Sequence, residues 1–112
     1  MIPKALGSAS VRPIILSILA RKDSYGYEII QHTKNLSNGS LDLQPGILYP
    51  ILRRLENDKL IESYWVHPKG ERKRRYYLLT KKGKAALDVE KREWLKMHEA
   101  FTRLWGPDPC FT

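Results

Sequence analysis

Positively charged side chains are concentrated in one stretch of this 112-residue sequence. Residues 69–84 hold eight Lys and Arg against a single acid, Glu71, which gives the stretch a net charge of +7. The other 96 residues carry 12 basic and 11 acidic side chains, so this stretch accounts for nearly all of the total charge of +8. A local cluster of this kind attracts phosphate backbones. A merely solvated surface is the plain alternative, and concentration of the charge on a predicted hairpin favours contact with nucleic acid.

Residues with catalytic or metal-binding potential are few and scattered. His32, His67 and His98 lack the spacing of metal ligands, and Cys110 is a lone thiol that we interpret as incidental and exposed. The sequence has no nucleophile elbow, phosphate-binding glycine loop or zinc-protease motif. The acids within residues 56–62 are interpreted as surface charge. We therefore expect no catalytic residues, no metal site and no cofactor.

Length and composition indicate one soluble domain. A chain of 112 residues can bury a modest core but has no room for a second one. The longest apolar run near the N-terminus, PIILSILA, is too short to span a bilayer and is poorly flanked for a signal peptide. The lone cysteine cannot form an intrachain disulfide, in agreement with a reducing compartment. These features predict a cytoplasmic protein without membrane contact.

A helix with Pro45 in its first turn is predicted before the basic stretch, and its pattern is clearest in ILYPILRRLENDKL. Its apolar residues recur every three or four positions and share one face directed at the core: Ile47, Leu48, Ile51, Leu52 and Leu55. The opposite face carries Gly46, Tyr49, Pro50, Arg53 and Asn57. Pro45 suits the first turn, where a missing N–H costs nothing. Little acidic charge lies near this end, whose N–H groups and dipole favour a phosphate.

A two-stranded hairpin is predicted directly after this helix. The segments IESYWVH and RRYYLLT are rich in aromatic and β-branched residues, and Pro68, Lys69 and Gly70 between them supply a turn. The hairpin tip would project five basic side chains outward: Lys69, Arg72, Lys73, Arg74 and Arg75. Trp65 is interpreted as hairpin packing.

Two further helices are predicted ahead of this unit. The first is capped by Ser10 and runs to about Arg21, with Pro13 in its first turn. The second is capped by Ser24 and places one set of residues along one side: Gly26, Ile29, Ile30, Thr33 and Leu36. Three helices followed by a hairpin is the order of a winged helix-turn-helix. The predicted fold class is therefore α+β, with a winged helix-turn-helix over residues 1–80 whose third helix enters the major groove.

A long helix over residues 81–106 is predicted after Thr80, which is a fair N-cap. Apolar residues form a heptad-like seam that Glu90 interrupts, and we expect them to make a dimer interface: Leu87, Trp94, Met97, Phe101, Leu104 and Trp105. The helix is longer than so small a core requires, so its far end is predicted to pack on a second copy. Gly106 and the prolines after it end the helix, and residues 107–112 are expected to be a flexible tail.

Four motifs, in order and at compatible spacing, resemble the PadR family of bacterial transcriptional regulators. They are YGYEI at 25–29, PGILYPILRRLE at 45–56, IESYW at 61–65 and RRYYLLTKKG at 74–83. The resemblance covers residues 6–104, and the single C-terminal helix is similar to that of the short-form members. It implies a homodimeric winged helix-turn-helix repressor that binds a palindromic operator in double-stranded DNA and is released by a small effector.

The resemblance also implies site residues by position. The residues that would face DNA on the helices are Tyr25, Gln44, Pro45, Gly46, Tyr49 and Arg53, and those in the wing are Lys69, Gly70, Arg72, Lys73 and Arg74. Trp94 falls where drug-binding short members place an aromatic ring in a pocket at the dimer interface, so a flat aromatic effector is implied. Met97 and Phe101 are expected to be dimer-core residues first and to line that pocket second.

The sequence departs from the family pattern at four positions. Gln44 replaces a small capping residue, Ile47 replaces Thr, Ala or Ser, and Leu78 replaces an Arg of the wing. Lys59 stands where the family favours Gly, which predicts either a left-handed residue at a cost of about 1 kcal/mol or a different helix end.

Several assignments stay open at this stage. Tyr25 and Tyr27 suit packing and phosphate contact about equally, whereas Gly26 favours close packing. For Tyr49 the two are nearly balanced, and its position off the apolar stripe favours phosphate contact. Trp94 suits a dimer core and a ligand shelf about equally. Two rival functions remain: a non-specific or architectural nucleic-acid binder, and a winged-helix module that binds another protein.

Overall fold

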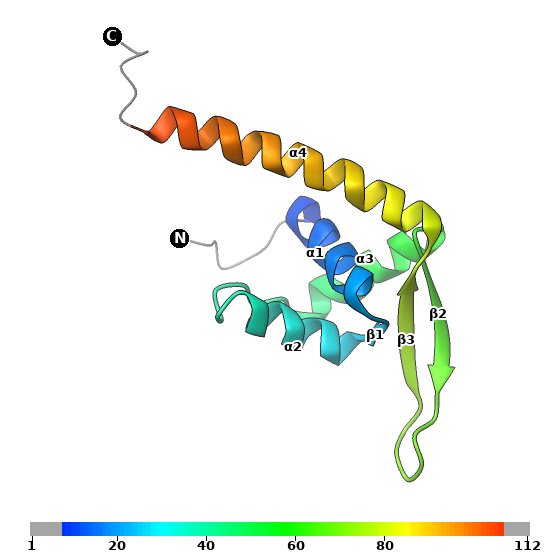
Figure 1. Ribbon diagram of the computed structural model, residues 1–112. Coiled ribbons are helices and arrows are strands. Elements are labelled where there is room, and N and C mark those ends of the chain that lie inside the picture. The colour runs from blue at the N-terminus through cyan, green and yellow to red at the C-terminus, as the bar shows by residue number, and fades with distance from the viewer. Residues whose placement is uncertain (1–7, 107–112) are drawn as a thin grey trace.

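The computed structural model of the protein describes residues 8–106, which form four helices and three strands (Figure 1). In chain order these are α1 (Ser8–Arg21), β1 (Ser24–Tyr25), α2 (Gly26–Leu36), α3 (Pro45–Asn57), β2 (Ile61–Val66), β3 (Arg74–Leu79) and α4 (Lys81–Trp105). The tail predicted for residues 107–112, Cys110 included, lies outside this range. The order confirms the predicted α+β winged helix-turn-helix with a long C-terminal helix.

The core lies between α1, α2, α3 and the root of the hairpin. The apolar stripe predicted for α3 faces it, since Leu48, Ile51, Leu52 and Leu55 are buried and Ile47 is half-buried. From α1 the core receives Val11, Ile15, Leu16, Ile18 and Leu19, and from the rest of the chain Ile29, Leu43, Leu60, Ile61, Tyr77 and Leu87. Leu36, predicted for the inner side of α2, is exposed, because it borders open pockets beside Ile18 of α1.

The sheet has three strands in the order β1-β3-β2, all antiparallel, and not the two that the sequence predicted. The extra strand is Ser24–Tyr25, in which Ser24 pairs with Tyr77. Ser24 is buried and its hydroxyl donates to the Lys22 carbonyl, so the prediction that it caps α2 is wrong. The N-cap is Tyr25, whose N–H donates to Glu28 Oε1 at 3.3 Å.

The bounds of two helices differ slightly from the predictions. Helix α1 begins at Ser8, so Ser10 lies inside it and Pro13 lies beyond its first turn. Helix α3 begins at Pro45 and continues through Pro50 to Asn57. Lys59 follows with φ +66°, so the first of the two predicted alternatives is confirmed and a non-glycine residue holds a left-handed conformation.

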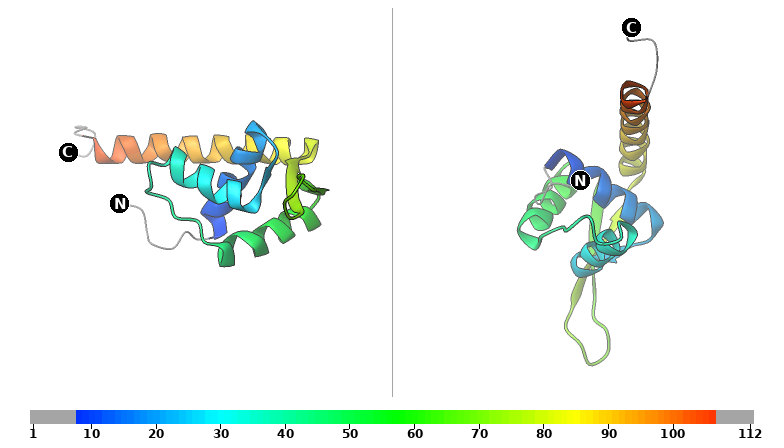
Figure 2. Two further views of the ribbon diagram at one scale, coloured as in Figure 1. Left: turned by 90° about the horizontal axis from the view of Figure 1, so that it is seen from below. Right: turned by 90° about the vertical axis from the view of Figure 1, so that its left-hand side faces the viewer.

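Helix α4 begins where predicted, with the Thr80 hydroxyl accepting the Gly83 N–H at 3.0 Å. Gly83 is buried against the hairpin root, where an added Cβ would lie 2.6 Å from Leu79 Cδ1 and still closer to the Leu60 carbonyl. The helix then runs past α1 on the side of the molecule opposite the wing tip (Figures 1 and 2). Residues 91–105 are all exposed, and the described chain measures 66 × 29 × 21 Å. Among the described residues no helix is both long and apolar enough to cross a membrane.

Candidate nucleic-acid interface

The outer face of α3 presents the residues that the sequence placed there. Gly46, Tyr49, Pro50 and Arg53 are exposed, and the first turn holds no acid. The N-terminus of α3 therefore offers an anion the positive end of the helix dipole and the Gly46 N–H, because Pro45 has no N–H and the Ile47 and Leu48 N–H groups donate to the Gln44 carbonyl. Gln44 is the N-cap residue, but its side chain donates to Asp42 Oδ2 at 2.7 Å and makes no cap bond to the helix.

The start of α2 lies directly against this face. A Cβ on Gly26 would lie 2.7 Å from Cζ of Tyr49 and still closer to its hydroxyl, so a side chain there would require the Tyr49 ring to move. This confirms that Gly26 is a close-packing residue. Tyr49 keeps 45% of its surface exposed while its ring packs on Gly26, so it both packs and remains accessible. Tyr27, the residue after Gly26 in α2, is exposed.

The wing tip carries three exposed cations, Lys69, Arg72 and Lys73, and turns at Gly70 with φ +77°. Arg74 and Tyr25 are also near the tip but contact each other, because the guanidinium lies 4.7 Å above the tyrosine ring. Arg74 further donates to Glu71 at 2.5 Å. Both residues are half-buried, so each offers DNA only part of its surface.

The two faces of the hairpin attach to different helices because successive strand residues alternate in direction. On one face Tyr64 and Tyr76 stack with ring centroids 5.8 Å apart, and Tyr76 meets Tyr25 edge-on. The Tyr64 hydroxyl donates to Asp23 Oδ2 at 2.6 Å, and this hydrogen bond raises the pKa of Tyr64 to about 12. This face is therefore tied to the corner between α1 and α2.

The other face of the hairpin is turned toward α3. Arg75, expected at the wing tip, instead lies within β3 and donates to Glu56 of α3, so that prediction is wrong. Tyr77, next on this face, is buried, which raises its pKa. The cleft between this face and the helices is lined by Tyr25, Gly26, Tyr49, Trp65, Lys73, Arg74, Arg75 and Tyr77.

The exposure of Trp65 and its contacts with two cations were not predicted from the sequence. Trp65 was interpreted as hairpin packing, yet 62% of its surface is exposed. Lys73 Nζ lies 5.7 Å and Arg75 Cζ 5.9 Å from its ring centroid, so two cations are in contact with the ring. Pairing of IESYWV against RRYYLL places Trp65 opposite Arg75, and that register was the signal available in the sequence.

The predicted dimer seam on α4 divides into two parts. Leu87 is buried in the core of its own protomer, so its assignment to the dimer interface is wrong. The other predicted interface residues are exposed in the protomer: Trp94, Met97, Phe101, Leu104 and Trp105. The rings of Phe101 and Trp105 stack with centroids 5.0 Å apart.

The boundary between these two parts is marked by Glu90. This residue, read from the sequence as an interruption of the seam, accepts from Arg12 Nε of α1 at 2.6 Å. It is the last half-buried residue of α4 before the exposed stretch.

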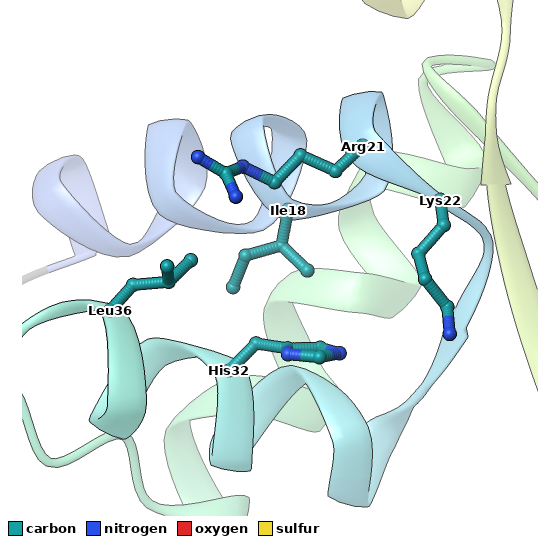
Figure 3. Close-up of a pocket in the computed structure, with 5 residues that line it drawn as sticks. All are labelled: Ile18, Arg21, Lys22, His32 and Leu36. Atoms are coloured by element: carbon teal, nitrogen blue, oxygen red, sulfur yellow. The ribbon is translucent and has the colours of Figure 1, made fainter.

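The effector residues predicted from the resemblance do not line a cavity of the single protomer that we can describe. A pocket between α1 and α2 is lined by Ile18, Arg21, Lys22, His32 and Leu36, and Trp94, Met97 and Phe101 are not part of it (Figure 3).

Comparison with known proteins identifies the family. The profile of the transcriptional regulator PadR-like family matches residues 15–89, which is most of the chain. The chain belongs to the PadR-like family. PadR-family regulators bind DNA, are typically dimeric and are generally not enzymes. The resemblance carried by the four motifs is thereby confirmed, and the protein is a PadR-family transcriptional regulator.

Individual relatives agree with the family assignment. Protein X of Lysinibacillus sphaericus, itself uncharacterised, is 40% identical over 86 residues, which is 77% of this chain and 79% of that protein. The transcriptional regulator YqjI of Escherichia coli is 37% identical over 83% of this PadR-like chain, and the match spans 42% of YqjI.

Solved structures show the same architecture. A transcriptional regulator from Clostridium thermocellum superposes with a TM-score of 0.79 at 28% identity, covering 88% of this chain and 95% of that one. A PadR family regulator from Clostridium difficile superposes with a TM-score of 0.73 at 36% identity, covering 86% and 98%.

Proposed function

We propose that this PadR-family regulator is a repressor that binds a palindromic operator as a homodimer and leaves it when a small aromatic effector binds. The observation that carries the proposal is the placement of the exposed face of α3 and the cationic wing tip on the same protomer, both free of the core. We infer a division of labour in which residues 1–80 bind DNA, residues 81–106 dimerise and residues 107–112 form a tail. The cytoplasm, where the chromosome lies, is the proposed location.

The proposed DNA contacts are of two kinds. The first turns of α3 enter the major groove, supported by the open N-terminus of the helix and by exposed Tyr49 and Arg53. The wing follows the phosphate backbone with Lys69, Arg72 and Lys73, while Arg74 contributes partially because Glu71 shares its charge. The remaining proposed contacts are Tyr25, Gln44, Pro45, Gly46 and Gly70.

The proposed dimer rests on the exposed apolar stripe of α4. Five large apolar side chains lie uncovered on about three turns of one helix, whereas single exposed apolar residues would need no explanation. A two-fold pairing of these stripes buries them and fixes the separation of the two α3 helices. A separation of about one DNA turn, roughly 34 Å, fits successive major grooves on one face of a duplex.

The proposed effector site lies between the paired α4 helices at Trp94, with Met97 and Phe101 beside it. Trp94 is 48% exposed in the protomer, so a planar molecule can stack on it within a dimer cavity. Such a molecule shifts the dimer away from its DNA-binding arrangement only by as much as its affinities for the two arrangements differ.

Salt dependence of DNA binding tests the wing assignment. Lys73→Ala should weaken binding to all duplexes alike and reduce the slope of log K against log salt concentration by about 0.9, because one phosphate contact is lost. Lys96→Ala is the matched control, since Lys96 is an exposed lysine on α4 away from the wing. An unchanged slope for Lys73→Ala, or an equal change for Lys96→Ala, contradicts the assignment.

Fluorescence titration tests the effector site. Planar aromatic compounds should quench tryptophan emission in the native homodimer, and Trp94→Phe should abolish most of that quenching while Trp65→Phe leaves it. Quenching that survives Trp94→Phe would place the ligand elsewhere.

A further inference from the structure

We propose that Glu56 and Arg75 form a brace that sets the angle of the wing relative to α3, and that both act as positioning residues for DNA binding without touching DNA. The inference rests on the proposed DNA-binding function. It assigns to Arg75, one of the eight cations of the basic stretch, a role inside the protein.

The brace is a closed set of hydrogen bonds between three elements. Glu56 lies in the last turn of α3, and its Oε1 accepts from Arg75 Nη2 of β3 at 3.0 Å. Its Oε2 accepts from the Ser63 hydroxyl of β2 at 2.5 Å. Arg75 Nε in turn donates to the Ser63 hydroxyl at 3.0 Å. Each of the three residues therefore contacts the other two, which fixes both strands against α3.

Aromatic rings restrict the guanidinium further. Arg75 Cζ lies 5.7 Å from the ring centroid of Tyr77 and 5.9 Å from that of Trp65. In the β2–β3 register Ser63 pairs with Tyr77 and Trp65 with Arg75, so these four residues share the face turned toward α3. A planar guanidinium held by rings and by a carboxylate has little freedom to turn toward a phosphate.

The position of the brace explains why it affects the angle of the wing more than the free energy of unfolding. The chain passes from α3 to β2 through only Asp58, Lys59 and Leu60, and the hairpin root at Ile61 is buried. Beyond that root, Ser63 and Arg75 lie partway to the tip. A pair as exposed as Glu56 and Arg75 contributes little to the free energy of unfolding. Its loss should therefore loosen the wing while the core stays folded.

The direction in which Glu56→Gln changes DNA affinity distinguishes a brace from a surface charge. If Glu56 is only a surface acid near DNA, Glu56→Gln removes a repulsive charge and should tighten binding. If Glu56 braces the wing, the same substitution should weaken binding. Glu62→Gln is the matched control, because Glu62 is an exposed acid on β2 whose pairing partner is Leu78 and which lies on the opposite face.

The test uses the full-length dimer and a duplex that the wild-type protein selects from random DNA. Glu56→Gln and Arg75→Gln should each lower affinity for this duplex about tenfold, with the salt slope unchanged, while affinity for random duplex changes less than about threefold. The double variant should bind no more weakly than either single one, because both remove the same unit. Glu62→Gln should bind as tightly as wild type or more tightly.

Three outcomes would overturn the brace: tighter binding by Glu56→Gln, a fall of the Arg75→Gln salt slope by about 0.9, or additive losses in the double variant. Amide hydrogen exchange on the free protein separates this failure from failure of the proposed function. Exchange in β2 and β3 should rise in Glu56→Gln and Arg75→Gln but not in Glu62→Gln, whether or not the wild type binds DNA. Unchanged exchange would also overturn the brace.

Discussion

The two halves of α4 share one heptad-like pattern but have opposite surroundings. Leu87 is 3% exposed and packs in the core of the winged helix-turn-helix, whereas Trp94, one heptad later, is 48% exposed. The first half is covered by α1 and the hairpin root, and the Arg12–Glu90 ion pair connects it to α1. The second half extends past every other element (Figure 1). A heptad pattern therefore identifies a stripe to be buried but does not say which surface buries it.

The largest effect that would distinguish the two halves of α4 is expected at Leu87. Leu87→Ala should cost about 2–5 kcal/mol of unfolding free energy, because it leaves a cavity in a packed core. Leu104→Ala should lower the melting temperature only at protein concentrations that support a dimer, since its partner is a second chain. Thermal melts across a dilution series measure both. If the loss of stability in Leu87→Ala disappeared on dilution, Leu87 would belong to the dimer interface and this division of α4 would be contradicted.

Loss of dimerisation is the next effect in size. Phe101→Glu should dissociate the dimer and reduce affinity for a palindromic duplex about 100-fold, because each half-site would be bound alone. Circular dichroism should stay unchanged, as Phe101 lies outside the protomer core. Arg92→Glu is the control: it lies nine residues earlier, about half a turn around the helix from Phe101, and changes the charge by more. Dissociation by Arg92→Glu but not by Phe101→Glu would place the interface on the opposite face.

The smallest effect is expected at Lys59, which lies in the short connection between α3 and β2. Lys59→Gly should raise the unfolding free energy by about 0.5–1 kcal/mol, because glycine adopts φ +66° without the steric cost that lysine pays. Asp58→Gly, at φ −82°, should instead destabilise the protein, as flexibility is gained without relief of strain. Chemical denaturation distinguishes them, and equal destabilisation by both variants would show that Lys59 is not strained.

Features set by local sequence were predicted, and features set by distant contacts were not. The buried stripe of α3, the two hairpin strands and the Thr80 cap depend on residues within a few positions of one another, so periodicity and capping chemistry sufficed. Ser24 looked like a cap because its type suits one, but pairing with Tyr77, far along the chain, makes it a strand.

The candidate site shows the same limit. Clustering of charge in the sequence predicted the exposed cations of the wing. It could not predict that Arg75 is not one of them, because Arg75 is held by Glu56, which lies on another element. The burial of Leu87 likewise depends on the packing of α4 against the core, which helical periodicity alone cannot supply. Exposed Trp65 could have been inferred only from the strand register.

Sedimentation equilibrium of the protein with the duplex it selects from random DNA tests the central claim most directly. Two protomers joined by their α4 helices should bind one duplex, so the complex should have the mass of one duplex and two chains. A complex of one chain per duplex, or no complex at low salt, would contradict it.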